Sequence, residues 1–146
     1  MNTFIPDLNF QICASLLDDK RLFKQAIEAK QIITILTTGK TKDDRDYPLS
    51  MKHHPIVKAW NGYVFTLKHY CNCMLREIDK RHKWNCEVIL YPLDETFGNF
   101  PPWLNYEVCR MYQAHLVRKD PFHYKFDVDP TIPFDWSLIN KTAKGP

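Results

Sequence analysis

Glycine is scarce in this chain, with only four residues among 146, and no long apolar run is present. An all-β sandwich needs many tight turns, so the shortage of glycine argues against that fold class. No segment approaches the roughly 20 apolar residues that a membrane helix needs, and no signal-peptide pattern opens the sequence. The five cysteines are odd in number and follow no such leader, which favours reduced thiols. We therefore expect an intracellular, cytoplasmic protein that contacts no membrane.

Sequence motifs for nucleotide or metal chemistry are also missing. There is no Walker loop, GxGxxG or GxSxG, so nucleotide-dependent transfer and serine-hydrolase chemistry have no support. There is no CxxC pair and no HExxH, and on a helix Cys71 and Cys73 would point about 200° apart, too far to share an ion. The acids of "DDRD" at 43–46 suit a metal-dependent nuclease, but they lie in a loop without a matching partner motif. We predict no metal site and no cofactor.

The overall composition is typical of one globular domain. Hydrophobic residues make up 45% and charged residues 25% of the chain, which is close to the globular average and argues against disorder. A length of 146 residues suits a single domain over residues 1–146. The net charge of +3 permits a polyanionic partner without demanding one.

Apolar periodicity predicts a compact all-α fold of three main helices with irregular connections. The first helix, capped by Ser15 or Asp18, carries apolar residues at helical spacing and stops at Gly39. The second helix begins at Pro55, a favoured first-turn residue, and has the strongest apolar face in the chain. The third helix occupies residues 105–118.

The remaining segments lack helical periodicity. Residues 1–15 should form an extended arm or loop, and residues 86–90 could form a short strand without a visible partner. The aromatic-rich C-terminal tail contains several prolines, so we expect it to wrap over the body without long helices.

One carboxylate, Glu28, lies on a stripe of the first helix that is otherwise basic or amide. At 100° per residue its neighbours on this face lie at about 20° (Arg21), −40° (Lys24), 60° (Gln25) and −60° (Gln31). The face is either solvated, with a Lys24–Glu28 ion pair worth a few tenths of a kcal/mol, or a carboxylate among phosphate-binding groups. Phosphates repel a carboxylate, so the second interpretation gives Glu28 a task such as general acid–base catalysis.

Basic and aromatic side chains alternate in "LVRKDPFHYKF", residues 116–126. The cations could neutralise phosphates while the aromatics stack on exposed bases. Alternatively, the cations lie at a helix C-terminus, where the helix dipole favours them, and the aromatics close the core. Upstream, "HHP" at 53–55 offers His54 as a phosphate contact, or merely as the extended neighbour that a proline requires.

These segments together resemble a known family. "LDDKRLFKQAIEAKQI" resembles the first helix of the pyrimidine-dimer DNA glycosylases of the phage endonuclease V type, which have an essential glutamate near its middle, and Glu28 falls on that glutamate. "MNTFIP", "HHPIVKAW" and "RKDPFHYKF" look like a broader bacterial and viral branch of the same family. The resemblance spans residues 1 to about 126.

The resemblance implies a fold and a reaction. The family fold is a compact all-α domain of three helices, and its chemistry requires no metal. A free N-terminal amine beside the glutamate attacks C1′ of a damaged nucleotide, displaces the base and forms a Schiff base. β-Elimination then nicks the strand, which is AP lyase activity. We therefore expect a DNA glycosylase that acts as a monomer on double-stranded DNA with a damaged or modified base.

The resemblance also assigns residues. Glu28 is the catalytic carboxylate, and the nucleophile is the amine of Met1, or of Asn2 after processing. The expected DNA contacts come from the first helix, "HHP" and residues 116–126: Arg21, Lys24, Gln25, His54, Arg118, Lys119, His123, Tyr124 and Lys125.

The sequence departs from the phage enzymes near its amine. Those enzymes lose the initiator methionine to expose threonine, whereas here the larger Asn2 follows Met1. Ile27 and Gln31 stand where the phage enzymes carry arginines. The lesion is therefore left open. Two alternatives stay open as well: a monofunctional glycosylase in which Glu28 activates water, and a non-catalytic DNA-binding or DNA-protecting module on the same fold.

Overall fold

The computed structural model describes residues 1–81, 87–93 and 99–143, and these residues form helices without strands. The helices follow in the order α1 (Phe10–Leu16), α2 (Asp19–Thr37), α3 (Leu49–Lys52), α4 (Pro55–Trp60), α5 (Val64–Arg81), α6 (Tyr106–Lys119) and α7 (Ser137–Ala143). The prediction of an all-α fold is confirmed. Within the described ranges, no helix is long and apolar enough to cross a membrane.

The three longest helices are α2, α5 and α6, which confirms the expected three main helices. Helices α2 and α5 pack against each other more extensively than any other pair. Helix α2 ends as predicted before Gly39, whose φ of +69° is a conformation that glycine adopts at little cost. The Gly39 N–H donates to the carbonyl of Thr34 at 3.0 Å, and this bond helps to close the last turn of the helix.

The predicted second helix is in fact two helices, and the prediction of one continuous helix from Pro55 is wrong. Helix α4 ends at Trp60, and α5 begins at Val64 after a turn at Gly62 with φ +88°. A Cβ at Gly62 would meet no atom within 4 Å, so this glycine is required by the backbone angle and not by space. The apolar pattern continues across the turn because both helices face the same core.

Two further predictions need correction. Residues 10–16 of the expected extended arm form α1, because the Asn9 side chain caps it by accepting from the N–H groups of Gln11 and Ile12. Asp18 occupies the N-cap of α2 but makes no capping bond, since its carboxylate binds Arg21 and Tyr124.

No strand forms in residues 87–90 of the described chain, and Cys86, the first residue of the predicted strand, lies outside the described residues. The other four cysteines are free and buried.

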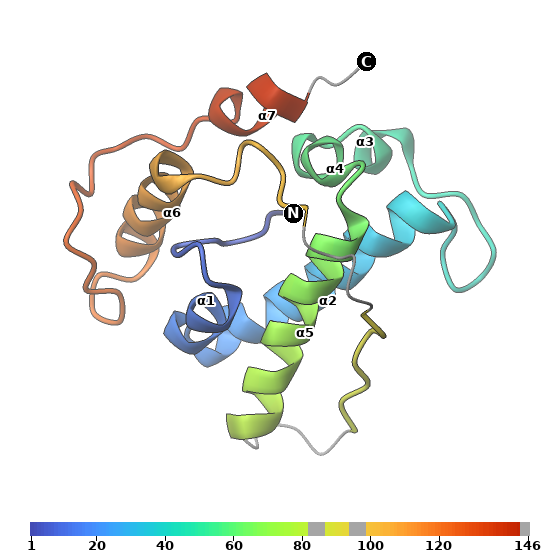
Figure 1. Ribbon diagram of the computed structural model, residues 1–146, viewed down its shortest axis with the longest axis horizontal. Helices are drawn as coiled ribbons and strands as arrows, with labels where there is room; N and C mark the ends of the chain where they lie inside the picture. The colour runs from blue at the N-terminus through green and yellow to red at the C-terminus, as the bar shows by residue number, and fades with distance from the viewer. Residues whose placement is uncertain (82–86, 94–98, 144–146) are drawn as a thin grey trace.

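The first residues of the chain lie in the middle of the molecule, between α6 on one side and α2 and α5 on the other (Figure 1). Residues 3–6 are buried. The Trp60 indole donates to the Thr3 hydroxyl at 3.1 Å, and the Gln113 side chain donates to the Pro6 carbonyl at 2.9 Å. An extended segment is tolerated there because helices α4 and α6 satisfy its polar groups.

The C-terminal tail passes along α6 and ends in α7, which packs on α4 (Figure 1). Its aromatic rings join the core, with Phe134 lying 5.3 Å from the ring of Tyr112 and 4.9 Å from that of Trp136. The tail is therefore a covering layer with one short helix, as its prolines predicted.

Candidate active site

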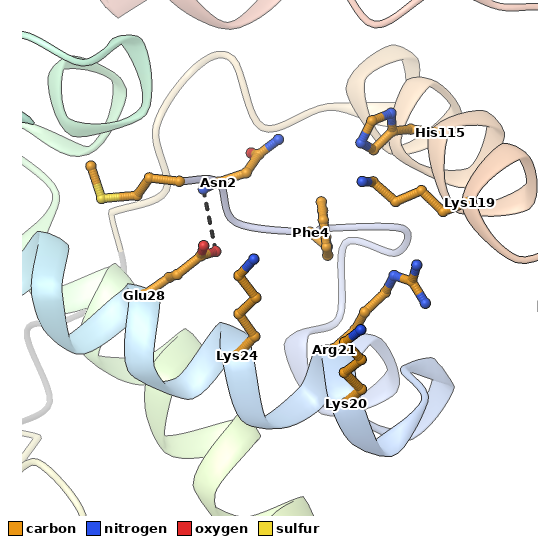
Figure 2. A pocket seen from close by; sticks show the side chains of 9 residues that line it. Asn2, Phe4, Lys20, Arg21, Lys24, Glu28, His115 and Lys119 are labelled. Atoms are coloured by element: carbon orange, nitrogen blue, oxygen red, sulfur yellow. Dashed lines mark hydrogen bonds between the residues drawn. The ribbon is translucent and has the colours of Figure 1, made fainter.

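A cavity of about 390 Å³ opens between the first residues, the N-terminal half of α2 and the C-terminal half of α6 (Figure 2). It is lined by Met1, Asn2, Phe4, Lys20, Arg21, Lys24, Glu28, His115 and Lys119. Figure 2 shows His115 and Lys119 on α6 facing the α2 side chains across the cavity. The cavity therefore depends on three segments that are far apart in the sequence.

Glu28 and the backbone of residue 2 meet inside this cavity. The Asn2 N–H donates to Glu28 Oε2 at 3.4 Å (Figure 2). The Asn2 side chain is itself held, because the Tyr112 hydroxyl donates to its Oδ1 at 2.7 Å. Within the described residues, Lys24 forms no ion pair with Glu28. The expected surface ion pair is thus absent, and the carboxylate faces the start of the chain.

Gln25 holds Glu28 and the backbone of Phe4, two residues after Asn2. Its Nε2 donates to Glu28 Oε2 at 3.0 Å, and its Oε1 accepts from the Phe4 N–H at 2.7 Å. The Tyr70 hydroxyl lies 2.7 Å from the same Oε1 and 2.8 Å from the Phe4 carbonyl, so its one proton is shared between two acceptors. Gln25 is completely buried. It has no surface with which to contact DNA, and the predicted contact is corrected to a positioning role.

Cations dominate the rest of the cavity wall. Four of its nine lining residues are basic, and Glu28 is the one acid among the nine. Arg21 is paired with Asp18 at 3.2 Å. Partial burial raises the pKa of Asp18, but the hydrogen bonds from Tyr124 and Arg21 outweigh it and hold the pKa below its ordinary value. A concave site with this charge attracts a polyanion.

A comparison with protein families now gives a match. A family model described as pyrimidine dimer DNA glycosylase matches residues 1–90. The chain belongs to this family. Searches among curated proteins and among solved structures found no match. At the level of the family, the chain is a DNA glycosylase, an enzyme whose substrate is DNA. The matched residues include Asn2 and Glu28, while the α6 wall of the cavity lies beyond them.

The cavity brings together only some of the predicted residues. Met1, Asn2, Glu28, Arg21, Lys24 and Lys119 line it. Arg118 is exposed but donates to the tail carbonyls of Pro130 and Ile132 at 2.6 and 2.5 Å. Lys125 and His123 are exposed outside the cavity. These three residues do not line the cavity.

Tyr124 is buried, which corrects its predicted DNA contact. Its hydroxyl donates to the Asp18 carboxylate and accepts from the Asp18 N–H, and its ring stacks on Phe126 with centroids 6.1 Å apart. Burial raises the pKa of Tyr124 well above its ordinary value. For Tyr124 the second interpretation of the 116–126 segment holds, in which the aromatics close the core.

His54 also has a structural task. Its Nδ1 accepts from the Ile56 N–H at 3.1 Å and so caps α4, and its ring meets Trp136 edge-on at 5.6 Å. Burial lowers the pKa of His54, and the positive charge of the N-terminal amine lowers it further. His54 is therefore near the amine but is not among the residues that line the cavity.

The acids at 43–46 serve the loop that carries them. Asp43 pairs with Arg45 at 3.1 Å, and Asp46 pairs with Lys40 at 3.3 Å. Among the described residues, no group of three or more His, Cys, Asp or Glu side chains is placed to hold a metal ion.

Three residues of the cavity were missed from the sequence: Phe4, Lys20 and His115. His115 packs against the rings of Phe4 and Phe134 at 5.8 and 5.1 Å. It lies one helical turn before Lys119, so the i, i+4 spacing of the two residues was the available signal. Burial, together with the charges of Lys119, Arg118 and Arg21, lowers the pKa of His115 to about 4.

The bridging role of Gln25 can be tested by substitution with methionine of similar volume. Gln25→Met leaves the buried Phe4 N–H without an acceptor, so the free energy of unfolding should fall by about 1–3 kcal/mol. Urea unfolding measures this loss. Gln31→Met on the same helix is the control and should change stability by less than about 0.5 kcal/mol. Equal effects of the two substitutions would contradict the bridging role.

The neutral state of His115 predicts a pH dependence of stability. Between pH 6.5 and 4 the unfolded chain binds a proton at His115 and the folded chain does not. The contribution of His115 to the free energy of unfolding is therefore fully present above about pH 6.5 and is lost as the pH falls to about 4. In urea unfolding at stepped pH, the wild type should lose more stability over this range than His115→Gln. Parallel losses would contradict the assignment.

Proposed function

We propose that the chain is a DNA glycosylase with AP lyase activity, in which the N-terminal amine is the nucleophile and Glu28 the catalytic carboxylate. The observation that carries this proposal is the 3.4 Å contact between the backbone nitrogen of Asn2 and Glu28 Oε2, inside a basic cavity. The substrate is double-stranded DNA with a damaged or modified base. Family membership favours a pyrimidine lesion.

The proposed reaction begins at the sugar of the damaged nucleotide. The lone pair of the amine forms a bond to C1′, and the C1′–N bond breaks as the base leaves with the bonding pair and takes up a proton. The amine nitrogen then gives one of its two protons to Glu28, and its lone pair forms the C1′=N bond as the C1′–O4′ bond breaks, which gives a protonated Schiff base and, once O4′ has taken up that proton, a hydroxyl at C4′. Loss of a C2′ proton expels the 3′ phosphate and nicks the strand.

Glu28 supports this sequence as a proton carrier. As a carboxylate it accepts a proton from the attacking amine, and as the acid it returns that proton to O4′ when the sugar opens. Gln25 fixes its Oε2 from one side at 3.0 Å. The carboxylate is thus presented to the amine in one orientation, which is what an efficient proton transfer needs.

The same contact supports an assignment of the amine. Removal of Met1 would turn the nitrogen of Asn2 into the free amine, already beside Glu28 and anchored through Tyr112. With Met1 in place, the free amine belongs to the preceding residue and lies near His54. With or without Met1, the protein keeps an amine at this cavity. We favour the form without Met1, because the Asn2 nitrogen is the one that bonds to Glu28.

The basic wall of the cavity is assigned to the phosphates on either side of the lesion. Lys20, Arg21 and Lys24 lie along the start of α2, and Lys119 faces them from α6 (Figure 2). Cations on two walls can hold the backbone at two points while the nucleotide between them turns into the cavity.

Borohydride trapping tests the nucleophile. The protein is incubated in EDTA with duplex DNA that carries an abasic site, and borohydride reduces the Schiff base to a stable adduct. Peptide mass spectrometry should find the adduct on the N-terminal residue, and the same spectra show whether that residue is Met1 or Asn2. An adduct on a lysine such as Lys24 would show that the amine assignment is wrong. Base release without any adduct would leave Glu28 activating water.

The carboxylate assignment predicts that Glu28→Gln lowers the rate of base release from a thymine-dimer duplex by at least about 100-fold, because it cannot carry the proton. Gel separation of the products after alkali measures base release. Glu107→Gln, an exposed acid at the start of α6, is the control and should keep the wild-type rate. A wild type that binds DNA but releases no base from a panel of lesions would favour the non-catalytic module.

The phosphate contacts predict a change in salt dependence. Each of Lys24→Ala and Lys119→Ala should reduce the slope of log K against log salt by about 1, because one fewer counterion is released. Fluorescence anisotropy at several salt concentrations measures the slope. Lys42→Ala, in the exposed loop after α2, should leave it unchanged. Wild-type slopes for both cavity variants would contradict the assignment.

A further inference from the structure

Phe122 stands out on the surface of the segment that follows α6. Its side chain is 90% exposed, the largest exposure among the large hydrophobic side chains that the structure describes. Isolated exposed hydrophobic residues are common on proteins and need no explanation by themselves. Phe122 differs in three ways: its turn is held by hydrogen bonds, it is close to cavity residues along the chain, and basic residues flank it.

The turn that carries Phe122 is fixed on both sides. The N–H groups of His123 and Tyr124 donate to the side chain and the carbonyl of Asp120, at 3.2 and 3.0 Å. The Lys125 ammonium donates to the Pro121 carbonyl at 2.8 Å, and the buried Tyr124 anchors the turn to α2. The phenyl ring therefore projects from a backbone that is already ordered, which lowers the entropy lost when it binds something.

Phe122 is also close to the cavity along the chain. It follows the cavity-lining Lys119 by three residues, so their Cα atoms are within about 11 Å of each other. Two residues after it, the Tyr124 ring lies 5.9 Å from the guanidinium carbon of Arg21, which also lines the cavity. The backbone that carries the exposed ring is thus linked to two residues that line the cavity.

The surface around the ring suits a polyanion. Exposed Arg118, Lys119 and Lys125 flank it in the sequence. Of the nearby acids, Asp120 turns its carboxylate to the His123 N–H of the same turn, and Asp127 is exposed five residues later. An apolar ring surrounded by cations is suited to a partner that has both phosphates and flat apolar faces, which is the chemistry of DNA.

We propose that Phe122 is a wedge that enters the base stack beside the lesion and stacks on a base left exposed when a nucleotide turns out of the duplex there. This inference rests on the proposed function. Moving a nucleotide out of the duplex costs the stacking of its neighbours, and an apolar side chain that enters the gap recovers part of that loss. Tyr124 and Phe126 are buried or partly buried, so Phe122 is the aromatic of this segment that is free to do so.

The test uses a duplex that needs no base release. It contains a tetrahydrofuran analogue of an abasic site with 2-aminopurine as its 3′ neighbour, whose fluorescence is quenched by stacking on DNA bases. The full-length protein carries Glu28→Gln throughout, so that chemistry plays no part. Binding should raise the fluorescence. Phe122→Ala should abolish most of that rise and weaken binding by about tenfold. Phe122→Trp should restore the affinity.

Two controls separate stacking from other effects. The salt dependence of binding should be the same with and without Phe122→Ala, because the ring carries no charge. Tyr106→Ala removes another highly exposed aromatic, 75% exposed at the opposite end of α6, and should leave both affinity and fluorescence unchanged.

The proposal is overturned if Phe122→Ala keeps the fluorescence rise and the affinity. It is also overturned if the substitution changes only the sedimentation of the free protein, which would make the ring a contact between copies of the chain. Failure of the proposed reaction would appear differently, as absent base release or trapping by the wild type, with the response to Phe122→Ala intact.

Discussion

A single buried amide joins the parts on which the site depends. The Gln25 side chain binds the backbone of Phe4 with its oxygen and the Glu28 carboxylate with its nitrogen, while the Tyr70 hydroxyl of α5 supports the same oxygen. The first residues of the chain, α2 and α5 therefore take their relative positions around one group. A buried amide whose donor and acceptor are both used is costly to displace, because each lost bond leaves a polar group without water. The same bonds that close the core thus orient the carboxylate.

The charges of the cavity, in contrast to the hydrogen bonds of Gln25, destabilise the free protein. Three basic side chains of α2 and one of α6 face each other across a space with a single carboxylate. Their mutual repulsion raises the energy of the free protein, and a phosphate backbone relieves it. Hydrogen bonds of the core fix the position of the Glu28 carboxylate, whereas the positive charge of the cavity is neutralised only when a phosphate backbone binds. Folding and binding place opposite demands on neighbouring residues of α2.

The sequence predicted what depends on local repetition. Helices α2 and α6 were found because their apolar residues repeat at helical spacing, and the end of α2 because Gly39 interrupts it. The break at Gly62 was missed, since the apolar face continues through the turn and periodicity cannot detect a change of axis. Gln25 and Tyr124 were assigned to DNA because their residue types suit phosphates and bases. Their burial depends on segments 21 and 106 residues away, which no local pattern reports. Family resemblance, and not spacing, singled out Glu28 as a candidate, because a lone carboxylate in a basic stripe looks like a surface ion pair until its contact with Asn2 is known.

The contact between Asn2 and Tyr112 spans 110 positions of the chain, and it has a consequence for synthesis. The ribosome releases the first residues at the outset, but the helix that holds them emerges near the end. Until then Asn2 and Pro6 lack the contacts with Tyr112 and Gln113 that hold them in the folded chain. Contacts of such long range slow folding, because the intervening chain must be closed into a loop before they form. The cavity therefore assembles only after α6 has been synthesised, and a nascent chain that stops before α6 would not carry it.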